Sequence, residues 1–323
     1  MRLDPPVQQF LDVNTREREF LAHLGVRRQR QYMRLLIDLN FLRFGRPGPA
    51  VHSVTDHAVT TVDGEIRCRM YRPSGRGPLP AHLAFHGGGW WQGSIDDLVV
   101  DALCRQRCAE ANLVVVSVDY RLAPEHPFPA GLSDGFAAFH WIVRNAEQFG
   151  IDPGTVSVGG SSAGANIAAA LTIKLRDNGS PQPVLQLLEV PVVDLTLTTA
   201  RHVAATTGGE RTVDDLEVAV GHYLRDAAQA RHPLASPLFA DDLSGLPPAV
   251  IFTAEHDLLR LDGERYGARL DAAGVPARVV PHPGALHGTA MITRTWDPAA
   301  RWQQEAATVL REAHWGQAGL AAG

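Results

Sequence analysis

The sequence is poor in cysteine, with three in 323 residues, at positions 68, 104 and 108. An odd, sparse count argues against the disulfide framework of a small secreted domain. Cys104 and Cys108 lie four residues apart on one face of a predicted helix. However, no Cys-x-x-Cys pair or matching histidine pair nearby would complete a metal site. We therefore expect buried thiols and no bound metal.

The sequence also lacks long runs of apolar residues or of one charge. No apolar stretch approaches the length of a membrane span, and the first residues, Met-Arg-Leu-Asp-Pro-Pro, have no signal-peptide core. The net charge is −5, and acidic residues interleave near the arginines at 27, 28, 30 and 34. These features favour a cytoplasmic protein with no nucleic-acid or membrane partner. We interpret the arginines as a solvated helix face.

No internal repeat or low-complexity linker divides the chain, and its length suits one large α/β domain with insertions. Short apolar strands alternate with helices, which predicts a mostly parallel sheet covered on both faces. Asp63-Gly64 predicts a tight hairpin that adds an antiparallel edge. The expected strands are 57–62, 65–71, 81–85, 113–118, 155–158, 185–190, 249–253 and 277–281, and the expected helices about 96–111, 131–148, 163–175 and 297–314.

Two segments fit no position in that sheet. Residues 7–44 show apolar residues at helical spacing, which predicts two or three helices that end at about Phe44. Residues 196–232 contain a helix-like stretch, Val213–Leu224, and look like an insertion above the sheet.

Residues 159–164 read Gly-Gly-Ser-Ser-Ala-Gly and lie between the predicted strand at 155–158 and a helix rich in Ala and Leu. In this context a Gly-x-Ser-x-Gly pattern predicts a nucleophile on a tight strand-to-helix turn, where small neighbours let the chain double back. Ser162 has glycines two positions before and after it, whereas Ser161 has an alanine ahead. Ser162 is therefore the predicted nucleophile. The alternative is a plain turn whose serine caps the helix.

A serine hydroxyl needs a base, an acid that orients the base, and fixed N–H donors for the oxyanion. The run His86-Gly87-Gly88-Gly89-Trp90 directly follows the predicted strand at 81–85. We expect the amides of Gly88 and Gly89, with that of Ala163, to be these donors. A phosphate-binding loop would need Gly-Lys-Ser/Thr before a helix, which is absent here.

Asp257 is the predicted acid, because it follows the strand at 249–253, whose carboxyl end should lie near the turn. Glu255 and Asp262 are alternatives, although Asp262 opens a predicted helix, where a carboxylate has a structural explanation. Asp194 is a weaker alternative, since it follows an earlier strand.

His287 is the predicted base, in a loop after the last predicted strand. His282, at the end of that strand, is the alternative, and among fourteen histidines any one is by default a surface residue. The chain order Ser162, Asp257, His287 is the order expected of an α/β hydrolase.

These stretches resemble the hormone-sensitive-lipase-like family of α/β hydrolases. The similar segments are 86–90 followed by Gly93-Ser94, 119–130, 160–166, 255–259 and 287–288, within about residues 57 to 290. The resemblance implies an eight-stranded α/β-hydrolase fold over residues 46–323. It also implies a helical cap from residues 1–45 and about 196–232, the triad and oxyanion donors named above, and dimers through the last edge strand.

The sequence departs from the family at Ser161, where many members have Asp or Thr. We interpret His86 as structural, with its ring holding the backbone of the glycine loop. The segment 119–130 is also interpreted as structural, because its prolines fix the path of the chain past the sheet edge.

The family predicts a serine carboxylesterase for short- to medium-chain acyl esters, working without metal or organic cofactor on a small-molecule ester. Trp90 and Trp91, with Phe20, Tyr32 and Phe41 of the N-terminal helices, are candidate pocket residues, although packing of cap against core explains each equally well. Cleavage of another acyl bond, in a lactone, amide or carbamate, is an alternative. So is a ligand receptor on this scaffold, similar to the plant gibberellin receptors, although such proteins typically lack the histidine of the triad.

Overall fold

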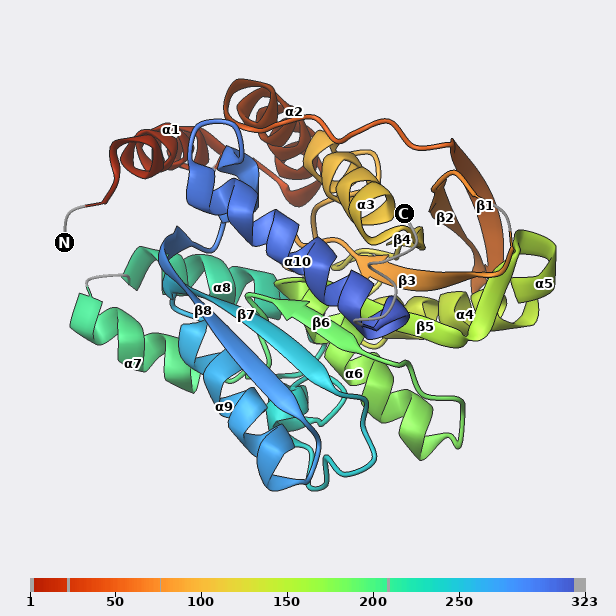
Figure 1. The fold of residues 1–323 in the computed structure, drawn as a ribbon. Helices are drawn as coiled ribbons and strands as arrows, with labels where there is room; N and C mark the ends of the chain where they lie inside the picture. Colours follow the sequence, from red (N-terminus) through yellow and green to blue (C-terminus); the bar gives the residue numbers. More distant parts are fainter. Residues whose placement is uncertain (1–2, 22–23, 76, 208–209, 317–323) are drawn as a thin grey trace.

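An eight-stranded sheet forms the centre of the computed structural model, which describes residues 3–21, 24–75, 77–207 and 210–316 (Figure 1). The side chains of residues 16–20, 207, 210 and 211 are not described. The strands are β1 (Ser53–Thr61), β2 (Gly64–Arg72), β3 (Leu79–Phe85), β4 (Val114–Asp119), β5 (Ile151–Ser161), β6 (Gln186–Glu189), β7 (Ala249–His256) and β8 (Ala277–Leu286).

Longer helices connect and flank these strands. They are α1 (Pro5–Leu21), α2 (Val26–Phe44), α3 (Leu98–Ala111), α4 (Ala130–Arg144), α5 (Ala146–Phe149), α6 (Ala163–Asp177), α7 (Thr198–Thr207), α8 (Glu210–Tyr223), α9 (Arg260–Ala272) and α10 (Asp297–Trp315), with short 3₁₀ turns η1 (Ala227–Arg231), η2 (Pro237–Phe239) and η3 (Thr289–Ile292).

The strand order is β1-β2-β4-β3-β5-β6-β7-β8. β1 and β2 form the antiparallel hairpin that Asp63-Gly64 predicts, β2 pairs antiparallel with β4, and the remaining neighbours are parallel. This confirms the predicted mostly parallel eight-stranded sheet. Since the parallel strands end at one edge, the loops that follow them gather there.

Helices cover both faces of the sheet. α3 and α10 lie on one face, and α4, α6 and α9 lie on the other (Figure 1). β3 is buried along its whole length, and its residues are apolar except for His82, whose ring lies 2.9 Å from the hydroxyl of Ser157. The three cysteines are buried and unpaired, as expected, and burial raises the pKa of the Cys68 thiol to about 12.

The structure differs from several of the expected element bounds. β8 continues to Leu286, five residues beyond the predicted end, so His282 lies inside the strand. The insertion holds a second helix, α7, which the sequence reading did not resolve. The segment 119–130 leaves the interior strand β4 at the carboxyl edge of the sheet.

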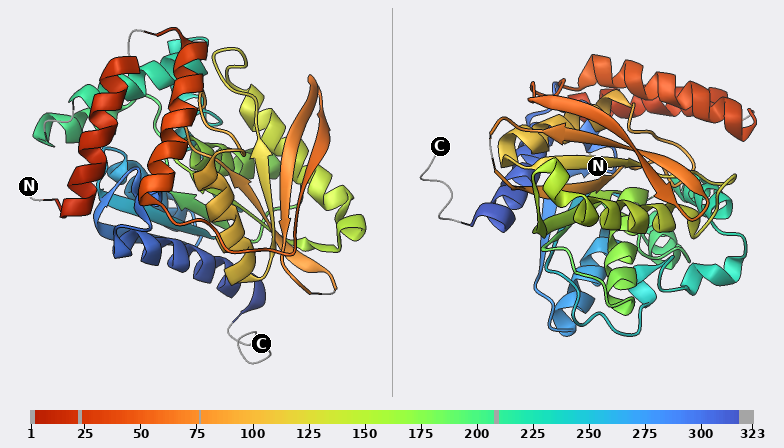
Figure 2. Two further views of the ribbon diagram at one scale, coloured as in Figure 1. Left: turned by 90° about the horizontal axis from the view of Figure 1, so that it is seen from above. Right: turned by 90° about the vertical axis from the view of Figure 1, so that its right-hand side faces the viewer.

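The segments expected to form the cap lie beside that carboxyl end. α1 and α2 run side by side, and α7 and α8 follow β6 in the chain (Figure 2). α8 reaches the glycine loop, because a Cβ added to Gly89 would lie 3.0 Å from the Cβ of Ala219. Within the part of the chain that the structure describes, no helix combines the length and apolar character needed to cross a bilayer.

Candidate active site

Ser162 lies alone between the last residue of β5 and the first residue of α6. Its backbone has φ 55° and ψ −117°, a strained conformation for a residue with a side chain. The Ser162 amide donates to the carbonyl of Glu189 at 2.9 Å, and its carbonyl accepts from the amide of Asn166 at 3.0 Å. These two hydrogen bonds hold Ser162 in a backbone conformation that an isolated peptide would not keep.

The glycines on either side of Ser162 are required by the end of β3. A Cβ on Gly160 would lie 2.5 Å from the carbonyl oxygen of Phe85, and one on Gly164 would lie 2.2 Å from the same atom. Ser161 is the last residue of β5, where it pairs with Glu189 in β6. The turn therefore places Ser162, and not Ser161, at its apex.

Three side chains from distant parts of the sequence meet at this turn. His287 follows β8, and its Nε2 lies 2.9 Å from Oγ of Ser162. Its Nδ1 lies 2.7 Å from Oδ2 of Asp257, which follows β7. The second carboxylate oxygen of Asp257 accepts the amide of Leu259 at 3.0 Å. The arrangement is the connected hydroxyl, imidazole and carboxylate of a serine hydrolase.

The alternative acids have other partners. Glu255 is exposed and accepts the amide of Gly284 at 2.7 Å. Asp262, in the first turn of α9, accepts the amides of Val193 and Asp194, both at 3.1 Å. Asp262 therefore holds the loop after β6, which is a more specific task than the helix-end role expected for it.

The alternative base, His282, lies inside β8 and contacts aromatic rings. Its ring stacks on Trp302 with centroids 4.0 Å apart, and burial lowers its pKa to about 4. His86 stacks on Tyr120 with centroids 4.3 Å apart, and the Tyr120 hydroxyl donates to the carbonyl of His86 at 2.9 Å. Both rings thus contribute to packing, and His86 braces the start of the glycine loop.

The glycine loop runs directly beside Ser162. A Cβ on Gly87 would lie 3.7 Å from the Cβ of Ser162. Gly88 and Gly89 have φ values of 119° and 58°, and a Cβ on Gly88 would lie 2.1 Å from the carbonyl oxygen of Gln92. Residues with a side chain rarely adopt these two backbone conformations, so both positions require glycine. The conformations orient the backbone amides of the loop in a way that a side chain at either position would prevent. The amide of Ala163 belongs to the first residue of α6, where N–H groups have no partner within the helix.

A buried ion pair supports the turn from below. Glu189, whose carbonyl binds the Ser162 amide, also accepts hydrogen bonds from Arg107 and from the indole of Trp302, the latter at 2.8 Å. The sequence reading missed Glu189, because nothing local distinguishes one strand-end carboxylate from another.

The candidate pocket residues lie in different environments. Trp90 is buried and stacks on Tyr223 of α8 with centroids 4.4 Å apart, and Trp91 packs against His222. Phe41 is buried in α2, whereas 46% of Tyr32 is exposed on that helix. The side chain of Phe20 lies outside the described residues. The pocket assignment of these five residues stays a prediction.

Phe10 of α1 is an aromatic neighbour of the site that the sequence reading did not single out. A Cβ on Gly288, the residue after His287, would lie 3.2 Å from the Phe10 ring. Its apolar character and helical spacing are shared with many packing residues, so the sequence held no signal of this contact.

A strand-to-helix serine, a histidine after the last strand and an acid after the strand before it, on a mostly parallel sheet, define an α/β hydrolase. A family model described as alpha/beta hydrolase fold matches residues 82–291. The chain is 42% identical to the carboxylic ester hydrolase LipN of Mycobacterium tuberculosis over 272 residues, which cover 82% of this chain and 72% of that protein.

Two further relatives match over a larger share of their length. An arylesterase of Saccharolobus solfataricus is 35% identical over 89% of this chain and 92% of its own. A solved esterase from Pyrobaculum calidifontis superimposes with a TM-score of 0.86 at 34% identity, over 97% of this chain and 99% of that chain. The protein belongs to the hormone-sensitive-lipase-like family of α/β hydrolases, as its motifs predicted.

Proposed function

We propose that this protein is a serine carboxylesterase that hydrolyses short- to medium-chain acyl esters through an acyl-enzyme on Ser162. The observation that carries the proposal is the continuous chain from Ser162 Oγ to His287 Nε2, and from His287 Nδ1 to Asp257. The names of the relatives, carboxylic ester hydrolase and arylesterase, support ester substrates.

In the proposed reaction, Ser162 attacks the ester carbonyl while His287 takes the hydroxyl proton. His287 then gives this proton to the departing alcohol, which leaves Ser162 acylated. Water attacks the acyl-enzyme, with His287 again removing a proton, and the acid is released. Asp257 holds the imidazole in the required tautomer and stabilises the imidazolium.

The negative charge that develops on the carbonyl oxygen needs donors fixed in advance. We assign this role to the amides of Gly88, Gly89 and Ala163. Loss of one such donor typically raises the barrier by about 3 kcal/mol. The glycine conformations and the position of the loop beside Ser162 support the assignment.

We propose that the cap restricts the acyl chain to short and medium lengths. Phe10 of α1 closes on Gly288, next to the base, and Ala219 of α8 closes on Gly89 of the glycine loop. Trp91, half-buried beside His222, is the candidate side chain for the acyl wall. A cytoplasmic location and a dimer through β8 stay predictions from the sequence and the family.

A panel of p-nitrophenyl esters from acetate to palmitate, assayed on the parent and on Ser162→Ala, tests the proposal. We expect a rate maximum at short or medium acyl chains and loss of turnover in Ser162→Ala. Ser161→Ala is the matched control, because it removes a neighbouring hydroxyl from the same turn and should keep activity. An active Ser162→Ala variant, or an inactive Ser161→Ala variant, would contradict the choice of nucleophile.

The same assay separates the alternatives. Lactones, amides and carbamates run alongside the esters would reveal another preferred acyl bond. Tight binding of an ester with no release of alcohol from the parent would instead indicate a receptor. Covalent labelling by a fluorophosphonate, absent in Ser162→Ala, provides a second readout that does not depend on the acyl group.

A further inference from the structure

Arg30 of the cap helix α2 reaches into the loops that surround the glycine loop. Its Nε donates to the carbonyl of Trp91 at 2.7 Å, and its Nη2 donates to the carbonyl of Ala123 at 2.8 Å. Both terminal nitrogens also bind the carboxylate of Glu125, at 3.2 and 2.8 Å. One guanidinium therefore joins the cap to two separate loops of the catalytic domain.

The carbonyl of Trp91 belongs to the same peptide unit as the amide of Gln92. That amide donates to the carbonyl of Gly88 at 3.0 Å. The Gly88 carbonyl in turn shares its peptide unit with the amide of Gly89, one of the proposed oxyanion donors. Arg30 is thus connected to the Gly89 N–H through two peptide units in series.

A second bond strengthens this connection. The amide of Ala123 donates to the carbonyl of Trp90 at 2.9 Å, so the loop after β4 and the glycine loop are joined directly. Arg30 closes this junction by binding the carbonyls on both sides of it. The planar guanidinium suits such a task, because its donors point in fixed directions.

Charge reinforces the geometry. A cation at the start of a chain of hydrogen-bonded peptides polarises each peptide in turn, which makes the last N–H a stronger donor. The hydrogen bond from Arg30 lowers the pKa of Glu125, so this carboxylate is ionised at neutral pH.

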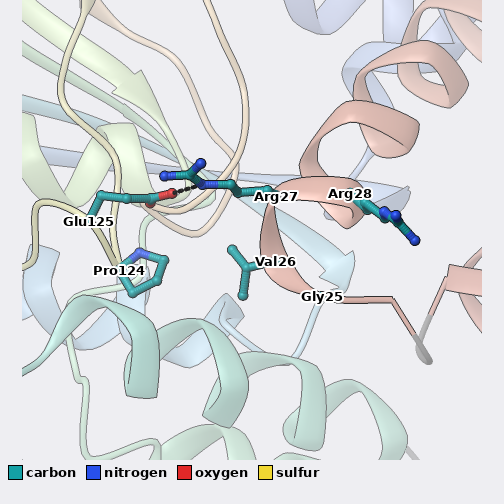
Figure 3. Close-up of a pocket in the computed structure, with 6 residues that line it drawn as sticks. All are labelled: Gly25, Val26, Arg27, Arg28, Pro124 and Glu125. Atoms are coloured by element: carbon teal, nitrogen blue, oxygen red, sulfur yellow. Dashed lines mark ion pairs between the residues drawn. The ribbon is translucent and has the colours of Figure 1, made fainter.

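The neighbouring arginines show how specific this arrangement is. A hollow of about 640 Å³ lies between the first turn of α2 and the segment Pro124–Glu125, and Arg27 reaches across it toward Glu125 (Figure 3). The Arg27 side chain is 87% exposed, and its nitrogen lies 3.9 Å from the carboxylate. Arg28 also lines the hollow, but its side chain points away from Glu125 (Figure 3). Arg27 shares the carboxylate of Glu125 and is therefore a matched control.

We propose that Arg30 is a positioning residue for the oxyanion hole: it orients and polarises the amide of Gly89 through the peptides of Trp91–Gln92 and Gly88–Gly89. The cap then does more than cover the acyl pocket, because it supplies a guanidinium that binds the backbone behind the glycine loop. This inference rests on the proposed function, since it assigns the oxyanion role to Gly89.

The test compares Arg30→Met, Arg30→Lys and Arg27→Met. For Arg30→Met we expect kcat to fall by about tenfold to a hundredfold with KM little changed, since an oxyanion donor acts mainly in the transition state. Arg30→Lys should retain part of kcat, because an ammonium keeps the charge but not the fork of donors. Arg27→Met should stay within about twofold of the parent, as expected for an exposed ion pair.

Chemical rescue separates positioning from a purely structural role. A second hollow, lined by Arg30, Gln31 and His126 among others, gives solvent access to the guanidinium site. Millimolar guanidinium should restore part of kcat in Arg30→Gly and should not change Arg27→Gly. A loss of kcat that follows a loss of thermal stability, with no rescue, would show a structural role only and would overturn the proposal.

Amide hydrogen exchange tests the positioning role of Arg30 without any measurement of catalysis. Arg30→Met should exchange faster than the parent in the segment 86–92, and Arg27→Met should not. If the parent protein hydrolyses no ester, the proposed function is wrong. The exchange measurement would still test whether Arg30 holds the segment 86–92 in place. A folded Arg30→Met with parental kcat, or with parental exchange in that segment, would refute the role of Arg30.

Discussion

At the scale of single residues, the site depends on how closely backbone segments approach each other. The end of β3 passes so near to the turn that Gly160 and Gly164 both face the carbonyl of Phe85. Side-chain chemistry alone does not make Ser162 a candidate nucleophile. It becomes one because its neighbours are small enough for the turn to close.

This reasoning predicts that Gly164→Ala is strongly destabilising. The new methyl group would lie 2.2 Å from a backbone oxygen that cannot move alone. Overpacking of this kind typically costs about 1–3 kcal/mol or more of unfolding free energy. Urea unfolding followed by circular dichroism measures this loss of unfolding free energy.

Gly221 in α8 is the matched control for this change. It has no neighbour within 4 Å of an added Cβ, and its φ is not positive. Gly221→Ala should be neutral or stabilise the protein by up to about 1 kcal/mol, because alanine favours helix more than glycine does. Equal unfolding midpoints for the two variants would refute the close-approach explanation.

At the scale of elements, α9 is joined to the loop after β6 by one buried carboxyl group. Asp262 accepts two backbone amides there, yet burial and the nearby charge of Asp194 raise its pKa to about 7. The two hydrogen bonds lower the pKa, and desolvation outweighs them. The carboxyl group is thus a structural acceptor that costs free energy when it ionises.

The raised pKa of Asp262 determines whether its contribution to stability rises or falls with pH. In the unfolded chain Asp262 has an ordinary pKa near 3.8, so between about pH 4 and 7 the unfolded state releases this proton first. The contribution of Asp262 to unfolding free energy should therefore fall as pH rises through that window, by at most about 1.4 kcal/mol per pH unit. Asp262→Asn keeps an oxygen acceptor and removes the titration, so its stability relative to the parent should increase with pH.

Urea unfolding at several pH values between 4 and 7 checks this prediction. Asp242 is the control, because it is exposed and hydrogen bonds from Ser244 lower its pKa. Asp242→Asn should change stability equally between about pH 5 and 7, since that carboxyl group is ionised in both the folded and the unfolded state over this range. A constant difference between Asp262→Asn and the parent would show that Asp262 ionises like an ordinary surface acid.

At the scale of the whole molecule, the N-terminal helices are part of the core. Phe10 and Phe44 meet edge to face with centroids 5.9 Å apart, in the same buried cluster as Trp296 and Trp302. Tyr223 of α8 belongs to the cluster on the other side of the sheet. The division of the chain into a cap and a catalytic domain stays a prediction from the sequence and the family.

We therefore predict that a core substitution in the cap destabilises the entire protein. Phe10→Ala should lower the unfolding free energy by on the order of 3 kcal/mol, because it empties a buried aromatic site. Leu39→Ala, at a position of α2 that is 51% exposed, should change it by no more than about 0.5 kcal/mol. An unchanged midpoint of tryptophan-monitored unfolding in Phe10→Ala would mean that the cap unfolds separately.

The sequence predicted those features that depend on neighbours in the chain. The spacing of glycines around Ser162, the glycine triplet after the strand at 81–85 and the hairpin at Asp63-Gly64 all express local backbone requirements. The chain order of Ser162, Asp257 and His287 matched the order expected of an α/β hydrolase. The same local logic failed at β8, which was predicted to end at Pro281 but continues to Leu286 because it pairs further with β7.

Sequence alone was thus enough for the class of fold, the candidate nucleophile, acid and base, and the expected chemistry. Tertiary structure decided which residues support them: Glu189 beneath the turn, Phe10 against Gly288, and Arg30 behind the glycine loop. The physical reason is that these contacts join segments far apart in the chain, so no local pattern of residue types records them. Hydrogen bonds to backbone carbonyls in particular impose no residue type on the accepting side, and only coordinates reveal them.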